Sequence, residues 1–298
     1  GFGAMGIKMQ AGEVGEVSRW AHDTIEWADG DPEKGNLIVG SPLAVALALR
    51  GVTRSWLGRP GWRQDLDDAV AFAEQSAEPL TLAVTMSFKY GTGAWNGVLP
   101  ADAAAVRTTE NALRTAEASG NDYAVVMITW ILSSMLLLRG AAGDLHRGLD
   151  LLAQVRDASV RQGFLGSELP VMDVYLGRER ARSGDPDGGI PVLQNSLDAM
   201  IAWDQVGYYI PAFGVLVETL LDRGTAGDLA EAEATTARLE AVPAEGSVIR
   251  DVYLLRMRAL LARARADEAS YRNHRDRYRA MATSLGFEGH MAWAEAMP

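Results

Sequence analysis

Hydrophobic residues recur along this chain at intervals of three and four, the spacing that places them on one face of an α-helix. Residues 228–242 are typical: Leu229, Ala232 and Leu239 share a face, charged residues lie off it, and Pro243 ends the predicted helix. No long stretch rich in β-branched residues alternates with the period of two that marks a half-buried strand. The pattern therefore predicts an all-α protein.

A glycine followed by an aspartate precedes three of the predicted helices, at Gly143-Asp144, Gly184-Asp185 and Gly227-Asp228. Glycine readily adopts the left-handed conformation that ends one helix, and aspartate accepts hydrogen bonds from the first free amide groups of the next. We therefore expect each pair to be a helix–helix junction, with the aspartate as the cap of the helix that follows.

A small residue follows each of these glycines at an interval of five, and the same small position can be traced earlier in the chain. Successive small positions are separated by 36, 43, 41 and 43 residues, roughly 41 on average, which is the length of a two-helix repeat. A small side chain there lets two helices approach closely, and stacked hairpins of this kind form an α-solenoid. The small positions are Ala69, Ala105, Gly148, Gly189 and Ala232.

The repeats resemble tetratricopeptide-type helical hairpins. Leu176-Gly177 precedes Gly189 by twelve residues, which is the interval between the Leu-Gly pair and the small residue in that family. The repeats are longer than the ~34 residues usual there, most lack the Leu-Gly pair, and GRPGWRQ at 58–64 looks like an insertion. The resemblance implies one solenoid domain over residues 1–298, a piece of a larger protein. We expect about fourteen helices in antiparallel pairs, stacked as a right-handed superhelix. Prolines recur after second helices at Pro32, Pro79 and Pro243.

The first six residues, GFGAMG, match the G-x-G-x-x-G fingerprint of dinucleotide-binding proteins. That fingerprint requires a strand before the glycines and a βαβ unit around them. Here a helical pattern follows and runs to Pro32, and Gly12-Glu13 with Val17 repeats the spacing of the later junctions. We therefore interpret residues 1–11 as the end of a first helix and not as a nucleotide site.

Candidate catalytic and metal-binding groups are sparse. No two histidines form the i, i+4 pair of a helical metal site, and neither the G-x-S-x-G motif nor the P-loop motif occurs. Asp65 to Asp68 could suggest Mg²⁺ ligation, but acids in a first helical turn are explained more simply by capping and the helix dipole. We expect the glycine cluster at 91–97 to be a linker between helices. We predict no catalytic, cofactor-binding or metal-binding residue, no cofactor and no enzyme activity in this chain. The histidines are His22, His146, His274 and His290, with His146 and His274 expected on helix surfaces.

Composition mainly restricts the partners. The formal net charge of −11 disfavours general binding to nucleic acid or to anionic membranes. The longest apolar run, residues 124–138, falls short of the ~20 residues that cross a bilayer, so we expect a buried helix there. The absence of cysteine excludes a disulfide framework and fits a reducing compartment. We therefore expect a cytoplasmic protein that binds neither nucleic acid nor membrane.

Two local features are candidate interaction sites. Residues 250–279 contain nine arginines and four acids and would suit an acidic partner surface or nucleic acid, although ion pairs on a solvated face are the simpler explanation. Trp203 and the pair Tyr208-Tyr209 lie near a predicted junction and could hold a peptide or small ligand. At helical spacing, core packing is the simpler explanation for these aromatic residues as well.

Two segments carry a more specific resemblance: GNLIVGSPLAVALALRGVTRSWLGRPGWRQDLDDAV at 35–70 and DRYRAMATSLGFEGHMAWAEAM at 276–297. They resemble the C-terminal helical region of large actinobacterial, especially mycobacterial, adenylate or guanylate cyclase-like proteins with a STAND-type ATPase module. The resemblance implies a non-catalytic sensor or scaffold that regulates the attached signalling domains by binding a protein or small-molecule effector. None of that family's catalytic residues has a counterpart here.

Two alternatives stay open beside this interpretation. Similar helical arrays precede DNA-binding domains, so the chain could be the effector-binding arm of a multidomain transcription regulator. It could also be an independent enzyme on an α/α scaffold, although no acid dyad or histidine pair supports that.

The two ends of the array should differ. We expect residues 286–297 to fold back on an arginine-rich helix near 256–279, with Phe287 and Trp293 as a lid. We expect the N-terminal end to leave apolar side chains uncovered and so to cause weak self-association. These side chains belong to Phe2, Met5, Ile7, Met9, Val14, Val17 and Ile25.

Overall fold

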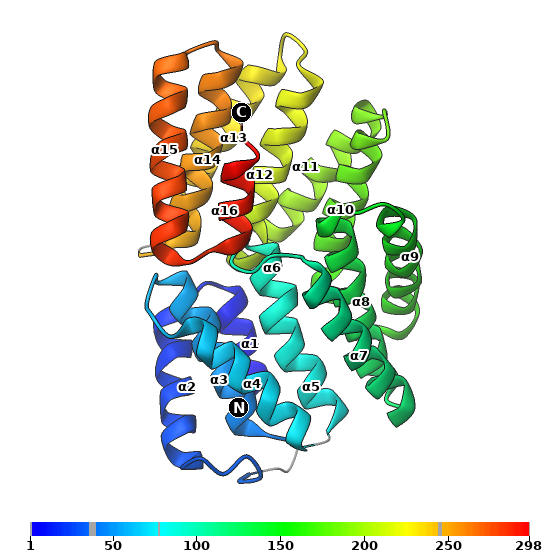
Figure 1. Ribbon diagram of the computed structural model, residues 1–298. Helices are drawn as coiled ribbons and strands as arrows, with labels where there is room; N and C mark the ends of the chain where they lie inside the picture. The colour runs from blue at the N-terminus through cyan, green and yellow to red at the C-terminus, as the bar shows by residue number, and fades with distance from the viewer. Residues whose placement is uncertain (1, 36–39, 77, 244–245, 298) are drawn as a thin grey trace. The chain divides into compact units, whose positions relative to one another are not determined.

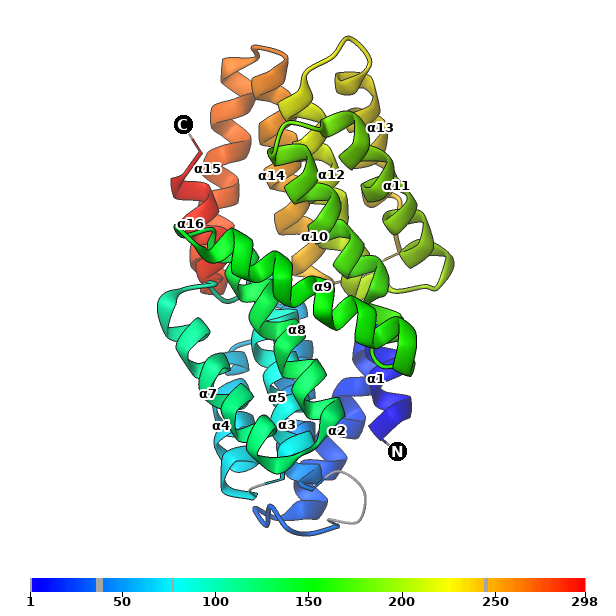
Figure 2. The same cartoon turned by 90° about the vertical axis from the view of Figure 1, so that its right-hand side faces the viewer.

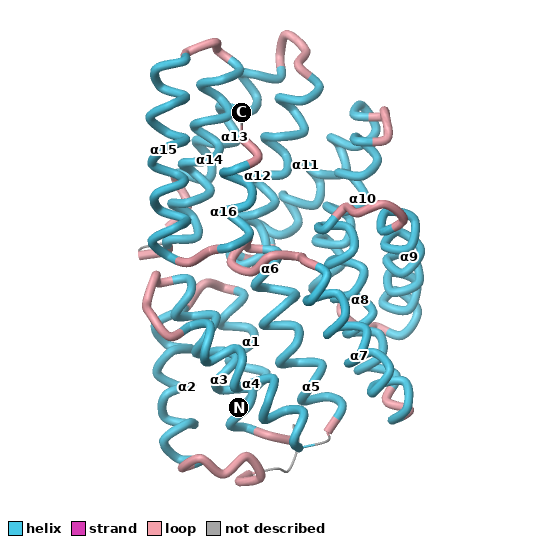
Figure 3. Tube along the Cα trace, viewed as in Figure 1, coloured by secondary structure: helices cyan, strands magenta, loops and turns pink. Residues whose placement is uncertain are grey.

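The computed structural model describes residues 2–35, 40–76, 78–243 and 246–297 (Figure 1). Across these residues the chain is helical and contains no strand (Figure 3). The predicted all-α, solenoid-like architecture is confirmed: within the described ranges fifteen helices have eight or more residues, and they pack in adjacent pairs. The handedness expected for the superhelix and the expectation of a single domain stay predictions.

The chain forms two compact units, which are described separately. The first comprises residues 1–9, 13–95 and 99–167, and the second comprises residues 10–12, 96–98 and 168–298. The helices up to the end of the first unit are α1 (Phe2–Gln10), α2 (Val14–Ala28), α3 (Pro42–Trp56), α4 (Trp62–Ser76), α5 (Pro79–Met86), the π-helical η1 (Ser87–Thr92), α6 (Gly93–Trp95), α7 (Ala103–Ser119), α8 (Asp122–Arg139) and α9 (Asp144–Gln162). After the short 3₁₀ turn η2 (Gly166–Glu168) come α10 (Leu169–Arg182), α11 (Pro186–Ala202), α12 (Val206–Arg223), α13 (Asp228–Glu240), α14 (Val248–Ala264), α15 (Glu268–Leu285) and α16 (Glu288–Glu295).

In the first unit, α3 packs against both α2 and α4 and is buried along most of its length. It begins after Ser41, whose hydroxyl accepts a hydrogen bond from the amide of Ala44 at 3.3 Å, and Pro42 occupies its first turn. Leu43 and Leu47 of α3 meet Ala69 of α4 in the core. The apolar run at 124–138 lies in α8; that helix is long and apolar enough to cross a membrane, and 67% of it is buried inside the chain.

In the second unit, the first helices of successive hairpins, α10, α12 and α14, lie side by side (Figure 2). Each packs against its own second helix, which is α11, α13 or α15. Side chains one repeat apart connect neighbouring hairpins: Arg223 binds Asp187 at 2.7 Å, and Arg238 binds Asp198 at 3.0 Å. These separations of 36 and 40 residues in sequence follow the repeat length.

The five predicted small positions are all buried, as close helix packing requires. A Cβ atom on Gly148 would lie 2.9 Å from the Leu137 side chain, and one on Gly189 would lie 2.5 Å from the backbone oxygen of Gly177. The sequence relation between Leu176-Gly177 and Gly189 therefore corresponds to a direct contact between α10 and α11.

The three Gly-Asp junctions lie at helix boundaries, but the predicted capping role is correct only for Asp185. This carboxylate accepts a hydrogen bond from an amide in the first turn of α11 at 2.9 Å. Asp144 and Asp228 are instead the first residues of their helices, and their carboxylates accept hydrogen bonds from amides three residues earlier. The left-handed residues that end α8 and α12 are Gly140, with φ 61°, and Gly224, with φ 67°. The predicted Gly143 and Gly227 instead precede the first residues of α9 and α13.

An arginine five residues earlier completes each of these junctions. Arg223 donates two hydrogen bonds to Asp228, with its Nε atom 3.0 Å from Oδ2. Arg139 binds Asp144 in the same two-point manner. An arginine in the last turn of one helix thus binds an aspartate at the start of the next helix. We call these pairs the junction latches, and they are Arg139–Asp144, Arg180–Asp185 and Arg223–Asp228.

The glycine cluster at 91–97 is a linker, as predicted, only in its last residues, where Gly97 lies in the turn after α6 with φ 67°. Residues 87–92 continue α5 as a π-helix, and α6 extends to Trp95. A π-helical turn inserts one extra residue without breaking the helix, so glycines that look like a break in the sequence are accommodated in a helix. The arginine-rich segment, in contrast, contains a break that we did not predict: α14 and α15 are separated at Ala266, which has φ 56°.

The two ends of the chain follow the predictions in part. Residues 2–10 are helical, as expected, but Met5, Met9 and Val17 are buried, so the exposed apolar area is smaller than predicted. Ile7 remains 70% exposed. The side chain of Phe2 lies outside the described residues. At the other end, α16 packs against α15 and Phe287 is fully buried, as the predicted lid requires.

Candidate functional site

The residues singled out in the sequence do not converge on a catalytic centre. The GFGAMG segment from residue 2 onward lies in α1, and the described residues contain no strand that would complete a dinucleotide fold. The acidic run in α4 is engaged by other side chains. Asp65 accepts hydrogen bonds from Arg50 and Arg54 of α3 at 2.7 Å, and Asp67 binds Lys89 at 2.7 Å. Among the described residues no group of three histidine or acidic side chains is placed to hold a metal ion.

Three of the four histidines lie on different helices and do not form a cluster. The side chains of His22 and His146 are 60% and 90% exposed and lie near acids one turn further along their helices. His274 is partly exposed, so its predicted surface position is confirmed only in part. Burial, together with the charge of Arg258, lowers its pKa.

His290 is fully buried near the start of α16. Its Nδ1 atom accepts a hydrogen bond from the Tyr278 hydroxyl at 2.9 Å, and its Nε2–H donates to the backbone oxygen of Asn96 at 3.0 Å. Burial, together with the charge of Arg256, lowers the pKa of His290 to about 3. A neutral imidazole with both nitrogens bonded is a structural group that holds α16 in place.

The arginine-rich segment is largely neutralised by the chain itself. Arg258 binds Glu240 at 2.7 Å, and Arg265 binds Glu233 at 2.6 Å, so acids of α13 compensate arginines of α14 and the turn after it. This arrangement supports the simpler interpretation, a solvated face with ion pairs.

The three aromatic candidates also have different surroundings. Tyr209 is buried and meets Phe213 edge to face, with ring centroids 5.9 Å apart. The Tyr208 hydroxyl donates to Glu168 at 3.2 Å. Only Trp203, at the end of α11, is largely exposed, at 57%. The three aromatic residues therefore do not form one ligand-binding surface.

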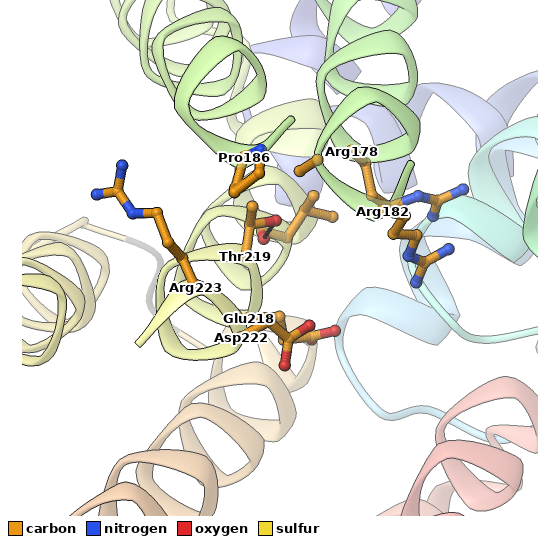
Figure 4. A pocket seen from close by; sticks show the side chains of 9 residues that line it. Arg178, Arg182, Pro186, Glu218, Thr219, Asp222 and Arg223 are labelled. Atoms are coloured by element: carbon orange, nitrogen blue, oxygen red, sulfur yellow. Dashed lines mark hydrogen bonds between the residues drawn. The ribbon is translucent and has the colours of Figure 1, made fainter. Parts of the chain in front are cut away.

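A recess that the sequence did not predict opens in the second unit between the last turns of α10 and α12 (Figure 4). Its volume of about 120 Å³ is several times that of a water molecule in the liquid. Arginines of α10 lie on one side and acids of α12 on another (Figure 4). Small and apolar side chains complete the lining: Ala181, Pro186, Val215 and Thr219.

The cationic side of this recess consists of two guanidinium groups that share one carboxylate. The Nε atom of Arg178 lies 2.8 Å from Oε1 of Glu179, and Arg182 reaches the same oxygen at 3.2 Å. Arg178 and Glu179 are only 8% and 9% exposed, and the Arg178 guanidinium lies over the Tyr175 ring at 5.1 Å. Burial, and then the like charge of Arg178, lowers the pKa of Arg182. Both guanidinium groups therefore bind the same carboxylate.

The anionic side consists of two carboxylates with different surroundings. Glu218 binds Arg256 of α14, whose guanidinium lies over the Trp293 ring at 4.8 Å. Asp222 is exposed and makes no hydrogen bond or ion pair with any residue that the structure describes. Arg223 also borders the recess but points away from it, toward the latch with Asp228 (Figure 4).

Opposite charges therefore face each other across the recess without joining. Within the described part of the chain, Arg182 makes no ion pair with Asp222 or with Glu218, although both carboxylates act on it electrostatically. The repeat pattern of the sequence does not indicate this site. Asp222 corresponds to Glu179 in the preceding repeat, at the same interval of 43 residues that separates Arg180 from Arg223.

A larger and more apolar hollow lies in the first unit, with a volume of about 440 Å³ and a lining that includes Met5, Trp20 and Trp27. The chain's own cations already lie over its aromatic faces. The ammonium group of Lys8 is 5.9 Å from the centre of the Trp20 ring, and that of Lys34 is 5.0 Å from Trp27. The charged recess is therefore the better candidate for an exogenous ligand.

Comparisons with models of protein families, with curated proteins and with solved structures found no match to this chain.

Proposed function

We propose that this chain is a non-catalytic sensor or scaffold module, in which the recess between α10 and α12 receives an effector. The observation that supports the proposal is the pair of unlike charges that face each other there without an ion pair between them. An effector in this recess touches the first helices of two consecutive hairpins. It can therefore favour one arrangement of those hairpins over another, by as much as its affinity for the two arrangements differs.

The links between hairpins are suited to such a response. Arg223 and Arg238 reach acids of the preceding hairpin, and the partner carboxylates, Asp187 and Asp198, are 85% and 64% exposed. Exposed ion pairs contribute only about 0–1 kcal/mol each. A small difference in ligand affinity between two arrangements of the hairpins is therefore comparable to the free energy that one such ion pair contributes.

The resemblance to cyclase-like STAND proteins suggests what the module regulates, namely an attached ATPase or nucleotide cyclase. In this proposal the module works in the cytoplasm, acts through a protein or small-molecule effector, and binds neither nucleic acid nor membrane. No feature of the recess favours the alternative of a transcription regulator.

A screen of the whole chain by thermal unfolding against metabolites and peptides, with Mg²⁺-ATP and Mg²⁺-GTP as expected non-binders, tests the proposal. We expect at least one effector to raise the midpoint saturably, because binding to the folded state alone stabilises it. Its effect should be lost when Arg182 is replaced by glutamine. Failure of every compound, or Mg²⁺-dependent binding of ATP or GTP in the micromolar range, would contradict the proposed function.

A further inference from the structure

The recess presents an unusual charge pattern for a ligand. A simple anion would meet Arg182 but would be repelled by the carboxylates of α12, and a simple cation would meet Asp222 but would be repelled by the two guanidinium groups. A molecule that carries both charges satisfies both sides. The apolar lining formed by Ala181 and Val215 leaves room for a small uncharged portion.

We propose that the recess binds a small zwitterion of the α-amino acid class. The ligand carboxylate accepts hydrogen bonds from Arg182, and its ammonium group donates to Asp222. This inference rests on the proposed function and specifies its effector. The volume of about 120 Å³ suits a free amino acid with a small or medium side chain and not a folded partner surface.

Both sides of the recess are held by buried groups. Arg178 is fixed between the Tyr175 ring and Glu179, which in turn anchors Arg182. Glu218 is fixed by Arg256, which is itself placed over an aromatic ring. Groups held in position before binding reduce the entropic cost of ordering a ligand. Arg182 and Asp222 are the two members left to complete their pairing with a ligand.

Isothermal titration of the whole chain with each of the common amino acids tests the inference. We expect at least one to bind with a dissociation constant below about 1 mM. The corresponding amino acid amide, which lacks the carboxylate, and the corresponding carboxylic acid without the amino group should each bind at least tenfold more weakly. Equal binding of the zwitterion and either analogue would overturn the two-charge assignment.

Substitutions of the lining residues test whether the ligand binds in the recess. Asp222→Asn keeps the shape of the side chain, Arg182→Gln keeps a shorter polar side chain, and each removes one charge, so each should weaken binding at least tenfold. The matched controls are Arg238→Gln and Asp198→Asn, which remove an exposed ion pair elsewhere in the same unit and should leave the affinity unchanged. Circular dichroism of each variant verifies folding.

The outcomes separate this inference from the proposed function. If no amino acid binds but another class of compound stabilises the chain in a manner that depends on Arg182, the zwitterion inference is wrong and the proposed function stands. Amino acid binding that survives both Arg182→Gln and Asp222→Asn would also overturn the inference, because the ligand would then lie elsewhere. If no compound binds, both are wrong.

Discussion

Gly177 and Gly189 lie against each other where α10 crosses α11, so closely that a Cβ atom on Gly189 would be 2.5 Å from the Gly177 carbonyl oxygen. The reverse distance, from a Cβ atom on Gly177 to the Gly189 oxygen, is 3.1 Å. The close spacing of α10 and α11 therefore requires glycine at both positions. The same helix α10 carries the cationic side of the recess.

Replacement of Gly189 by alanine should destabilise the protein by about 2 kcal/mol or more, because backbone atoms have to move to make room for the methyl group. Chemical unfolding measures the change. Gly15 in α2 provides the control, since a Cβ atom there meets nothing within 4 Å. Gly15→Ala should raise stability by about 0.5–1 kcal/mol, because alanine is the better helix former. Equal effects of the two substitutions would show that the contact between the glycines is not tight.

The junction latch at Asp228 should be visible in the pH dependence of stability. Hydrogen bonds from Arg223 lower the pKa of Asp228 from 3.8 to about 2. A carboxyl group with a lowered folded-state pKa stabilises the fold above its ordinary pKa, and this contribution is lost as the pH falls through about 2. Asp228→Asn should therefore cost about 2 kcal/mol at neutral pH, and its difference from the wild type should shrink between pH 4 and pH 2.

Urea unfolding of both proteins over this pH range measures the latch. Asp198→Asn is the control, because Asp198 is 64% exposed and its ion pair with Arg238 should contribute less than about 1 kcal/mol. A cost at Asp228 no larger than that at Asp198 would contradict the structural role of the latch.

His290 should stay neutral throughout the range in which the folded protein is stable. Its folded-state pKa of about 3 lies below the ordinary value of 6.5, so between these two pH values the imidazole is protonated in the unfolded chain and neutral in the folded chain. The free energy of unfolding should consequently fall as the pH decreases from about 6.5 to 3, by at most about 1.4 kcal/mol per pH unit from this residue.

Nuclear magnetic resonance of the imidazole protons tests this assignment. The His290 signals should not shift between pH 7 and pH 5, with the exposed His146 as the comparison in the same spectrum. Protonation of His290 in that interval would show that the hydrogen bonds to Tyr278 and Asn96 do not persist in solution.

The repeat organisation was predictable because it depends on local requirements that are visible in one sequence. A position such as Ala232 has to be small wherever two helices touch, and a glycine such as Gly224 ends a helix at little cost, so both recur at the repeat length. The latches carry an equally visible signal, since an arginine stands five residues before each aspartate, as in RGAAGD at 139–144 and RGTAGD at 223–228.

The features that the sequence did not predict depend on tertiary contacts. The glycines at 91 and 93 look like a break, but the chain continues as a helix through them, with η1 packed against α8 and α6 buried. The recess combines Arg182 and Asp222 from different hairpins, and the spacing alone cannot tell whether such residues form an ion pair or stay apart. The environment of His290 likewise depends on Asn96, which is 194 residues away in the chain.

Self-association through α1 should be weaker than the sequence suggests, because Met5 and Met9 are buried and, among the described side chains of α1, Ile7 is the large apolar one that is exposed. Light scattering over a wide concentration range should show at most a weak rise in mass, and Ile7→Glu should abolish it. Val160→Glu in α9, which changes an aliphatic residue that is 62% exposed, is the control and should have no effect. A rise in mass that persists in the Ile7 variant would place the contact elsewhere.

The central claim is that the unlike charges of the recess are kept apart for a ligand and not for the stability of the fold. The free energy of unfolding of the double variant Arg182→Gln with Asp222→Asn, measured without ligand, tests it most directly. Arg182 and Asp222 make no ion pair with each other, and Glu179 keeps its hydrogen bond to Arg178 when Arg182 is replaced. We therefore predict a value within about 0.5 kcal/mol of the wild type, or a higher one. A loss of about 2 kcal/mol or more would show that these side chains stabilise the hairpins themselves, and would contradict the assignment of the recess as a binding site.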